Sequence, residues 1–385
     1  RLAGLDVVRL INEPAAAALA YGLGHAGTER IVVLDFGGGT FDMTVLEISN
    51  NVFEVKCSVG DSHLGGDDID AEIMQWVFQK FLAEKGFALP KEPMILRRLK
   101  DASEKAKCEL SIARQAMIHL PFLTLHDNVP VNFEATLMRS EFESLIRKRL
   151  KDLLVITNKG LEVVGMAPED IDRIILVGGS MRIPLLQEMI EEYFQKPPFK
   201  GLNPDEIVAM GAATQGGVLN GKLREVVLLD VTPHSLGIEV ENNLVSRVIE
   251  KNSIIPIRAS KIFTTTHDDQ DVVQVHVLQG EGETVSECRS LGNFVLEGIQ
   301  KGRAGTARIE VTFSINASGM VEVTALDLVT REERSVGVTV SPGDSSGIDS
   351  KQLSADQRRQ RAAQRVADMM PDAIPNRSPE VINRS

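Results

Sequence analysis

The sequence predicts two structural classes in succession, an α/β region followed by an antiparallel β region. Up to about residue 225, apolar strands alternate with glycine turns and amphipathic helices, which indicates an α/β architecture. From Val231 to about Ser341, apolar residues recur at every second position, as in strands with one buried face. We therefore expect a multidomain chain divided at 1–225, 226–230, 231–341 and 342–385.

The elements of the first region follow from periodicity and turn residues. Pro14 suits a first helical turn, so a short helix is expected at 15–21, and apolar residues at helical spacing predict another at 69–85. A helix is expected to open at Ser140, because Ser140 and Glu143 have the spacing of a capping box. Short apolar runs predict strands at 6–11, 31–34, 43–48, 52–59 and 174–177.

The second region contains the clearest strand signals. Alternation at 309–315, a turn at 316–319 and renewed alternation at 321–325 predict a β-hairpin with one buried face. Val273, Val275 and Val277 form a similar apolar row. The short strip 226–230 reads as an apolar linker, 342–350 as a polar linker, 356–369 as a polar helix, and the residues from 371 as disordered.

Composition narrows the class of protein. The chain has 385 residues, 43% apolar and 25% charged, which is typical of globular domains, and its net charge of −12 gives no sign of a nucleic-acid or anionic-membrane partner. The three cysteines lie far apart, so neither a zinc site nor a disulfide framework is indicated, and a reducing compartment fits. No apolar run is as long as a membrane helix.

The segment 31–42 is the strongest functional signal. A strand ends at Asp35 and continues into Gly37, Gly38, Gly39 and Thr40, before Asp42 opens a second strand. Glycines at such a turn let backbone N–H groups approach a bulky anion, and two carboxylates beside it suit a hydrated Mg²⁺. Taken alone, the three glycines could equally be a flexible turn.

Further polar residues stand where strands meet helices. Glu13 precedes a predicted helix, where it could orient a water or serve as a modest helix cap. Glu104, Lys107, Cys108 and Ser111 share one helical face, which could be an ordinary solvated face or a clamp for ribose and base.

Two other glycine turns extend this pattern. Gly178, Gly179 and Ser180 follow a buried strand, and Arg182 could stack on a base; a plain strand-to-helix turn is the alternative. Gly65 and Gly66 form a further glycine pair at a strand-to-helix turn. The glycine turns together predict a nucleotide cleft.

Several segments together resemble the DnaK-type seventy-kilodalton heat-shock chaperone family, over nearly the whole chain to about residue 341. They are INEPAAAALAYG at 11–22, LDFGGGTFD at 34–42, GDSHLGGDDID at 60–70, ASEKAKCELS at 102–111, ILVGGSMRIP at 175–184, NPDEIVAMGAATQGG at 203–217, VLLDVTPHSLGIE at 227–239 and HVLQGE at 276–281.

The resemblance implies an actin-like ATPase lobe, an apolar linker and a β-sandwich that binds extended peptides. It implies that Glu13 positions the attacking water and that Asp35 and Asp42 hold Mg²⁺ through water. The glycine loop with Thr40 would cradle the phosphates of ATP or ADP. The remaining nucleotide contacts that the resemblance implies are Gly65, Gly66, Glu104, Lys107, Ser111, Gly178, Gly179, Ser180, Arg182 and Asp205.

The resemblance also assigns the second region. The linker residues would be Val227, Leu228, Leu229 and Asp230, and the peptide-binding residues Ile238, Val240, Glu241, Phe263, Thr266, Val273 and Val275. Ordinary sandwich core is the alternative for the apolar members of this set. Glu241 and Thr266 replace the Met and Ala that family members commonly place over the bound peptide.

The function implied is that of an ATP-dependent chaperone whose ATP state controls the release of unfolded polypeptides. J-domain co-chaperones and nucleotide exchange factors are the expected partners, and the cytoplasm the expected compartment. The chain begins at Arg1, and the family's first lobe and most of its lid have no counterpart. We therefore expect a fragment with little ATPase activity by itself. A non-hydrolysing holdase or exchange factor remains an alternative, and a small-molecule kinase is disfavoured by 227–341.

Overall fold

The computed structural model describes residues 4, 7–23, 27–223, 226–338, 348–349 and 380–381, with side chains for all of these except 336–338, 348–349 and 380–381. Its contacts divide the chain into two compact units, Asn12–Leu229 and a second unit made of Arg1–Ile11 with Asp230–Ser385. The division falls within the predicted linker 226–230. The four-part domain scheme stays a prediction.

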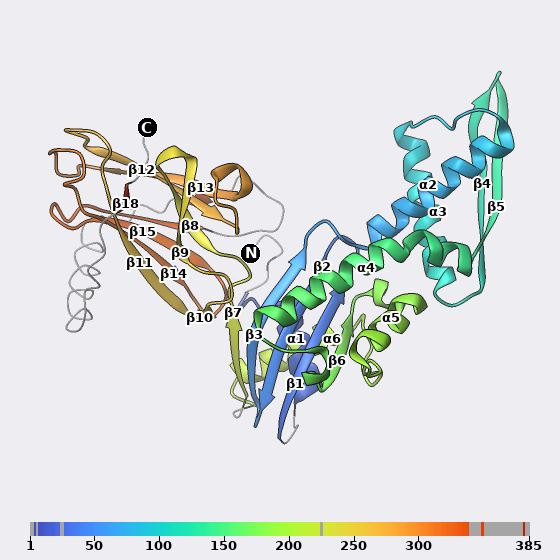
Figure 1. Cartoon of the computed structure of the whole chain (residues 1–385), viewed down its shortest axis with the longest axis horizontal. Helices are drawn as coiled ribbons and strands as arrows, with labels where there is room; N and C mark the ends of the chain where they lie inside the picture. Colours follow the sequence, from blue (N-terminus) through green and yellow to red (C-terminus); the bar gives the residue numbers. More distant parts are fainter. Residues whose placement is uncertain are drawn as a thin grey trace. The chain divides into compact units, whose positions relative to one another are not determined.

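The first unit is a mixed α/β structure built on one main sheet (Figure 1). Within the unit the strand order is β7-β3-β2-β1-β6, with β1 to β3 antiparallel and β6 and β7 parallel to their neighbours. Its elements are α1 (Glu13–Gly22), β1 (Thr28–Phe36), β2 (Phe41–Ser49), β3 (Val52–Asp61), α2 (Gly66–Lys85), α3 (Pro93–Leu110), β4 (Gln115–His126), β5 (Val129–Met138), α4 (Arg139–Val163), η1 (Pro168–Asp170), β6 (Arg173–Val177), η2 (Gly179–Arg182), α5 (Pro184–Phe194), α6 (Ile207–Leu219) and β7 (Val227–Val231).

Helix α1 packs closely against α6 because most of its buried side chains are small. Proline stands in its first turn, as predicted, and a run of alanines keeps its buried side narrow. This allows α6 to approach so closely that a Cβ added to Gly211 would lie 1.7 Å from the carbonyl oxygen of Ala16. The α1–α6 crossing therefore requires glycine at position 211, and it fixes the helix that begins at Glu13.

Two local predictions are wrong. Helix α4 begins at Arg139 with Met138 as its N-cap residue, so Ser140 does not form a capping box. Strand β5 runs directly into the helix there, and the Arg139 side chain donates a hydrogen bond to the carbonyl of Leu110 at 2.8 Å. Residues 7–11 form no strand, because no neighbouring strand of the described structure pairs with their backbone.

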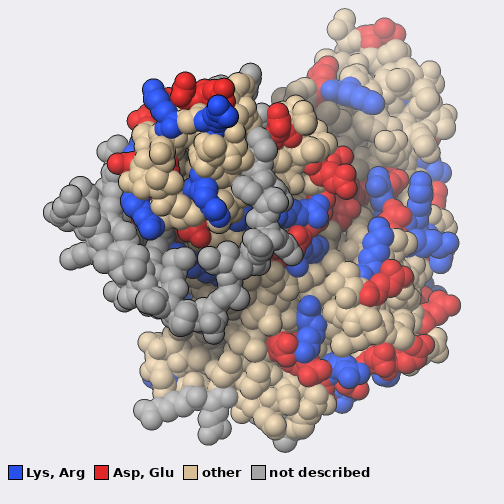
Figure 2. Space-filling model, turned by 60° about the vertical axis from the view of Figure 1, so that its left-hand side comes forward, with Lys and Arg blue, Asp and Glu red and all other residues tan. Residues whose placement is uncertain are grey.

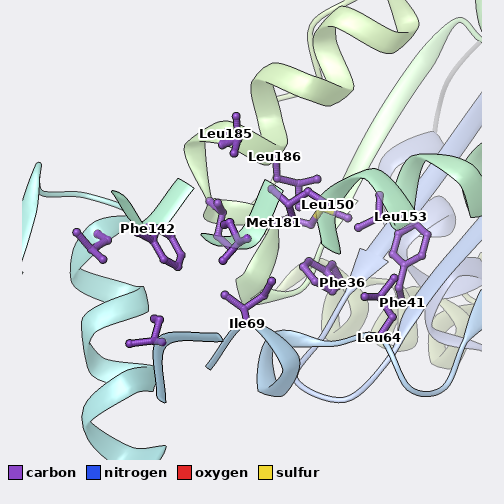
Figure 3. Close-up of a cluster of buried hydrophobic side chains, with 14 of the residues drawn as sticks. Phe36, Phe41, Leu64, Ile69, Phe142, Leu150, Leu153, Met181, Leu185 and Leu186 are labelled. Atoms are coloured by element: carbon purple, nitrogen blue, oxygen red, sulfur yellow. The ribbon is translucent and has the colours of Figure 1, made fainter. Parts of the chain in front are cut away.

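The core of the first unit lies where the main sheet meets α2, α4 and α5. Figure 3 shows Phe36 and Phe41 at the ends of β1 and β2, together with Leu150 and Leu153 of α4. Ile69, Met181 and the α5 leucines are buried in the same cluster. The core therefore fixes the end of β1 and the start of β2, between which the glycine loop lies.

The second unit is built from strands. One sheet has the order β17-β16-β15-β14-β11-β18 and another the order β13-β12-β8-β9. A single hydrophobic cluster takes side chains from both sheets. Its elements are β8 (Leu236–Val240), η3 (Glu241–Asn243), β9 (Leu244–Ile249), β10 (Ile254–Ile255), β11 (Ile257–Thr264), β12 (Val272–Gln279), η4 (Val285–Glu287), β13 (Arg289–Glu297), β14 (Ile309–Ile315), β15 (Val321–Asp327), β16 (Glu333–Val338), β17 (Ile348–Asp349) and β18 (Glu380–Val381).

The hairpin predicted at 309–325 is confirmed. Strands β14 and β15 pair antiparallel from Ile309 opposite Asp327 to Ile315 opposite Val321. At its turn the side-chain oxygen of Asn316 accepts the backbone N–H of Ser318 at 2.9 Å, and Gly319 has a φ of 72°. The predicted helix at 356–369 and most of the tail from 371 lie outside the described residues. None of the described helices is both long enough and apolar enough to span a membrane.

Candidate functional site

The loop Gly37–Thr40 connects β1 to β2. It is closed by a hydrogen bond from the Gly37 N–H to the Thr40 carbonyl at 3.1 Å. A Cβ added to Gly38 or Gly39 would meet no atom within 4 Å, whereas one added to Gly65 would lie 2.3 Å from the Gly38 carbonyl oxygen. The loop therefore has an open side, and its other side rests on the start of α2.

Carboxylates gather at the base of this loop. Asp35 and Asp42 face each other across the antiparallel pair β1–β2, and Thr40 donates a hydrogen bond to Asp42 at 3.3 Å. Burial, together with the smaller effect of the Glu13 and Asp42 charges, raises the pKa of Asp35 to about 7. The predicted catalytic residues Glu13, Asp35, Thr40 and Asp42 thus lie at one place.

This cluster fits a cation held through water. Within the described part of the chain, no group of three or more His, Cys, Asp or Glu side chains could hold a metal directly. Mg²⁺ commonly keeps several waters and needs few protein ligands, so Asp35 and Asp42 suffice as the acceptors of its water shell. Burial is the main cause of the raised pKa of Asp35, and the smaller contribution from the Glu13 and Asp42 charges is a repulsion that such a cation would relieve.

Helix α3 supplies a polar face, as its spacing predicts. Leu99, Ala106 and Leu110 are buried on the side opposite Glu104. Glu104, Lys107, Cys108 and Ser111 all line a cavity of about 650 Å³. This face therefore borders a cavity, and its role as a clamp for ribose and base stays a prediction.

The turn after β6 forms the opposite wall. Gly178 has a φ of 88°, and an added Cβ would lie 2.5 Å from the Phe36 carbonyl oxygen, so only glycine fits there. Ser180 donates a hydrogen bond to the Gly37 carbonyl at 3.2 Å. Arg182 makes a 2.6 Å ion pair with Asp205. This turn is thereby tied to the glycine loop.

The cavity brings together most of the predicted nucleotide contacts from segments far apart in the sequence. It is lined by Gly37, Gly38, Glu104, Lys107, Cys108, Ser111, Ile112, Gly179, Ser180, Arg182, Ile183, Gln187 and Asp205. Gly65, Gly66 and Gly178 support the loops behind it. Ile112, Ile183 and Gln187 were not predicted to line it, although Ile183 lies within the segment 175–184 and the other two follow a recognised segment by one and three residues.

Lys107 is held differently from what its family role suggests. Its ammonium nitrogen lies 2.9 Å from Asp70 Oδ1 and donates hydrogen bonds to Asp70 Oδ2 and to the Gly66 carbonyl, each at 3.0 Å. Burial raises the pKa of Asp70, and the contact with Lys107 partly offsets that shift. Asp70 was missed as a candidate, because nothing in its spacing relates it to Lys107.

The apolar peptide-binding candidates are buried in the second unit. Ile238, Phe263, Val273 and Val275 have at most 1% of their surface exposed and belong to the hydrophobic cluster, against which Val240 also packs. Their side chains offer no surface to a ligand in this structure, so ordinary core describes them better. Glu241 is exposed, and Thr266 is partly exposed with its N–H bonded to Gln270 at 3.2 Å.

The predicted linker residues form strand β7. Val227, Leu228 and Leu229 pair in parallel with Val52, Phe53 and Glu54 of β3, so this strip extends the main sheet. Val227 keeps 48% of its surface exposed. The Asp230 side chain accepts the N–H of Val231 at 2.8 Å.

Charges are interspersed on the surface. On the described part of the face shown in Figure 2, Lys and Arg are interspersed with Asp and Glu among a larger area of other residues. This pattern agrees with the acidic net charge of −12 and offers no broad basic stripe to a nucleic acid on that face.

The comparison with protein families adds an independent line of evidence. Residues 1–380 match the family described as Hsp70 protein. Members of that family are ATP-dependent chaperones that bind nucleotide, typically with Mg²⁺, and unfolded polypeptides. Because the match spans far more than half of the sequence, this chain belongs to the Hsp70 family.

Proposed function

We propose that the chain binds ATP and ADP in the cavity between α3 and the turn after β6, as part of a DnaK-type chaperone. The observation that carries this proposal is the cavity of about 650 Å³ lined by the glycine loop, the polar face of α3 and the Ser180–Arg182 turn. Those segments are separated by tens of residues, and each was predicted to contact one part of a nucleotide.

Different residues of the site would contact different parts of the nucleotide and its cation. Backbone N–H groups of the glycine loop suit the phosphates, and Glu104 can accept hydrogen bonds from ribose hydroxyls. Asp35 and Asp42 would hold a hydrated Mg²⁺, which neutralises phosphate charge when bound. Glu13 would orient the attacking water, so positioning and charge would account for hydrolysis.

Peptide binding is proposed for the second unit, as a β-sandwich whose hydrophobic cluster lies between two sheets. Binding of an extended apolar segment there requires Ile238, Val273 and their neighbours to become accessible, because they are buried in this structure. Exposed Glu241 favours peptides with basic flanks. The pairing of Val227–Leu229 with β3 supports a linker that transmits the ATP state.

J-domain co-chaperones and exchange factors are proposed as partners, and the cytoplasm as the compartment, which cell fractionation would check. Hydrolysis by the isolated chain should be negligible. The family's second phosphate loop, which would help to exclude water, has no counterpart recognised in this sequence. Steady-state turnover equal to that of a complete family member would contradict this.

Titration of the chain with a fluorescent ADP analogue in Mg²⁺ tests the site. Glu104→Ala should weaken binding by about tenfold, because it removes a charged hydrogen-bond acceptor. Lys105→Ala is the matched control, since Lys105 is exposed on the same helix and pairs with Glu109 at 3.9 Å. Equal affinities for the two variants would contradict the assignment of the cavity.

Anisotropy with labelled apolar peptides tests the second unit in the same full chain. Lys-flanked peptides should bind more tightly than Glu-flanked ones, and added salt should reduce the difference. Replacing Leu228 and Leu229 with Asp should leave binding intact but remove any effect of ATP on the off-rate. Binding of neither peptide would contradict the peptide-binding role.

A further inference from the structure

We propose that Asp70 is a positioning residue that couples the nucleoside wall of the cavity to the phosphate loop through Lys107. Asp70 is not among the residues that line the cavity, but its side chain accepts a hydrogen bond from Lys107, which does line it. This inference rests on the proposed nucleotide site. It adds Asp70, which lies behind the α3 face of the cavity.

The Asp70–Lys107 pair is buried and closely matched. The side chains are 2% and 10% exposed, and the ammonium nitrogen lies 2.9 Å from Oδ1 and 3.0 Å from Oδ2. A buried charge without a partner is strongly unfavourable, so each residue fixes the other in place. The Lys107 cation is thereby compensated inside the protein, and only its stem is left to contact a ligand in the cavity.

The same ammonium group reaches the start of α2. It donates a hydrogen bond to the Gly66 carbonyl at 3.0 Å, and a Cβ added to Gly66 would lie 2.9 Å from it. The Gly66 N–H in turn donates to the Gly37 carbonyl at 2.9 Å, and the Asp67 N–H donates to the Gly38 carbonyl at 2.7 Å. Asp70 and Lys107 therefore hold the backbone segment on which the glycine loop rests.

This arrangement sets the direction of the loop N–H groups. In a trans peptide the C=O of one residue and the N–H of the next point in opposite directions. Because the carbonyls of Gly37 and Gly38 are bound by the first turn of α2, the N–H groups of Gly38 and Gly39 point away from that helix. Those are the donors a phosphate needs, so the position of Lys107 affects phosphate binding.

The first measurement is the affinity of the chain for adenosine and for ADP by calorimetry. Asp70→Asn should weaken ADP binding by about tenfold, within the range typical of coupling between sites, and adenosine binding by less than about twofold. Asp67→Asn is the matched control, because it removes a carboxylate from the same helical turn whose side chain pairs with Lys100 at 3.1 Å. Equal losses for adenosine and ADP would overturn the proposal.

A double-mutant cycle shows whether Asp70 acts through Lys107. Lys107→Met keeps most of the stem and removes the ammonium, so it should reproduce the selective loss of ADP affinity. Asp70→Asn should then have no further effect in the Lys107→Met background. Losses that multiply in the double variant would overturn the proposal, because they would mean that the residues act separately.

Hydrogen exchange in the absence of nucleotide separates this inference from the proposed function. The amides of Gly66 and Asp67 should exchange about tenfold faster in both single variants than in wild type, and the Asp67→Asn control should not differ. If wild type binds neither ligand, the nucleotide site fails and exchange alone decides the coupling. Unchanged exchange in both single variants would overturn it.

Discussion

The family resemblance assigns ligand-binding residues to both units, but the structure exposes the two sets differently. The nucleotide candidates of the first unit line a cavity, and the apolar peptide-binding candidates of the second unit are buried. Glu104, Arg182 and Asp205 line open space, whereas Ile238, Phe263 and Val275 have no exposed surface. Polar side chains and glycines at strand ends are poorly suited to a core, so their pattern is informative about a site. Apolar residues at alternating positions satisfy a core and a pocket equally well.

The packing of the two units also depends on different residue properties, the absence of a side chain in the first and side-chain volume in the second. The first unit depends on glycine, because Gly65, Gly178 and Gly211 allow backbone segments to approach each other where a Cβ would not fit. The second unit depends on side-chain volume, since its cluster is filled by Val, Ile and Phe. The stability of the first unit should therefore be most sensitive to substitutions that add a side chain at these glycines. The stability of the second unit should be most sensitive to substitutions that shorten a buried side chain.

The largest effect is expected at the α1–α6 crossing. Gly211→Ala would place Cβ 1.7 Å from the Ala16 carbonyl oxygen, so it should lower the free energy of unfolding by more than about 4 kcal/mol and displace Glu13. Gly216→Ala on the same helix is the control, because a Cβ there meets no atom within 4 Å. It should raise stability by up to about 1 kcal/mol. Urea unfolding measures both, and equal midpoints would contradict the close crossing.

A somewhat smaller effect is expected in the second unit. Phe263→Ala should reduce the free energy of unfolding by about 3–5 kcal/mol, because it leaves a cavity in a packed cluster. Met320→Ala is the control, since Met320 is 51% exposed, and it should change stability by less than about 0.5 kcal/mol. Thermal unfolding of the full chain provides the comparison. Unchanged stability combined with lost peptide binding would show that Phe263 lines an open pocket instead.

Much of the first unit could be predicted, because its signals are local. Strands ending in glycine turns at 31–42 and 174–180 were located correctly, since glycine and strand periodicity act within a few residues. The cavity followed, because turns at the same edge of one sheet meet in space. The Ser140 cap failed since β5 enters the helix directly, a feature set by tertiary pairing.

Other features depend on contacts that no spacing reveals. Asp70 and Lys107 are 37 residues apart, and only the packing of α2 on α3 brings them together. Ile183 and Gln187 line the cavity because of where α5 begins. Strand 6–11 failed because a strand requires a partner, and its pattern carries no information about whether one is present.

The carboxylate cluster gives a pH-dependent prediction. The folded-state pKa of Asp35 is about 7 against 3.8 for an ordinary aspartate, so the folded state binds the proton more tightly. Stability from this group is present at low pH and is lost as pH rises toward and through 7. Asp35→Asn removes that loss and should make the Mg²⁺-free chain more stable than wild type at pH 8 by about 2 kcal/mol, with a smaller gain at pH 5.5.

Urea unfolding in EDTA at the two pH values measures this difference. Adding Mg²⁺ and ADP should reverse the order at pH 8, because the cation then stabilises wild type through Asp35 and Asp42. A stability gain that is the same at both pH values would show that neither burial nor its neighbours' charges raise the pKa of Asp35. The carboxylate cluster would then be no evidence for a cation.

The smallest effect is expected at the rim of the cavity. Asp205 pairs with Arg182 at 2.6 Å, but both side chains are about half exposed, so Asp205→Asn should cost less than about 1 kcal/mol of stability. Released from this pair, Arg182 should hold a base less well, and ADP affinity should fall by about two- to threefold. Glu206→Gln changes the same net charge one residue away and controls for long-range electrostatics. If both variants weaken ADP equally and the effect disappears in high salt, Asp205 acts through its charge alone and does not orient Arg182.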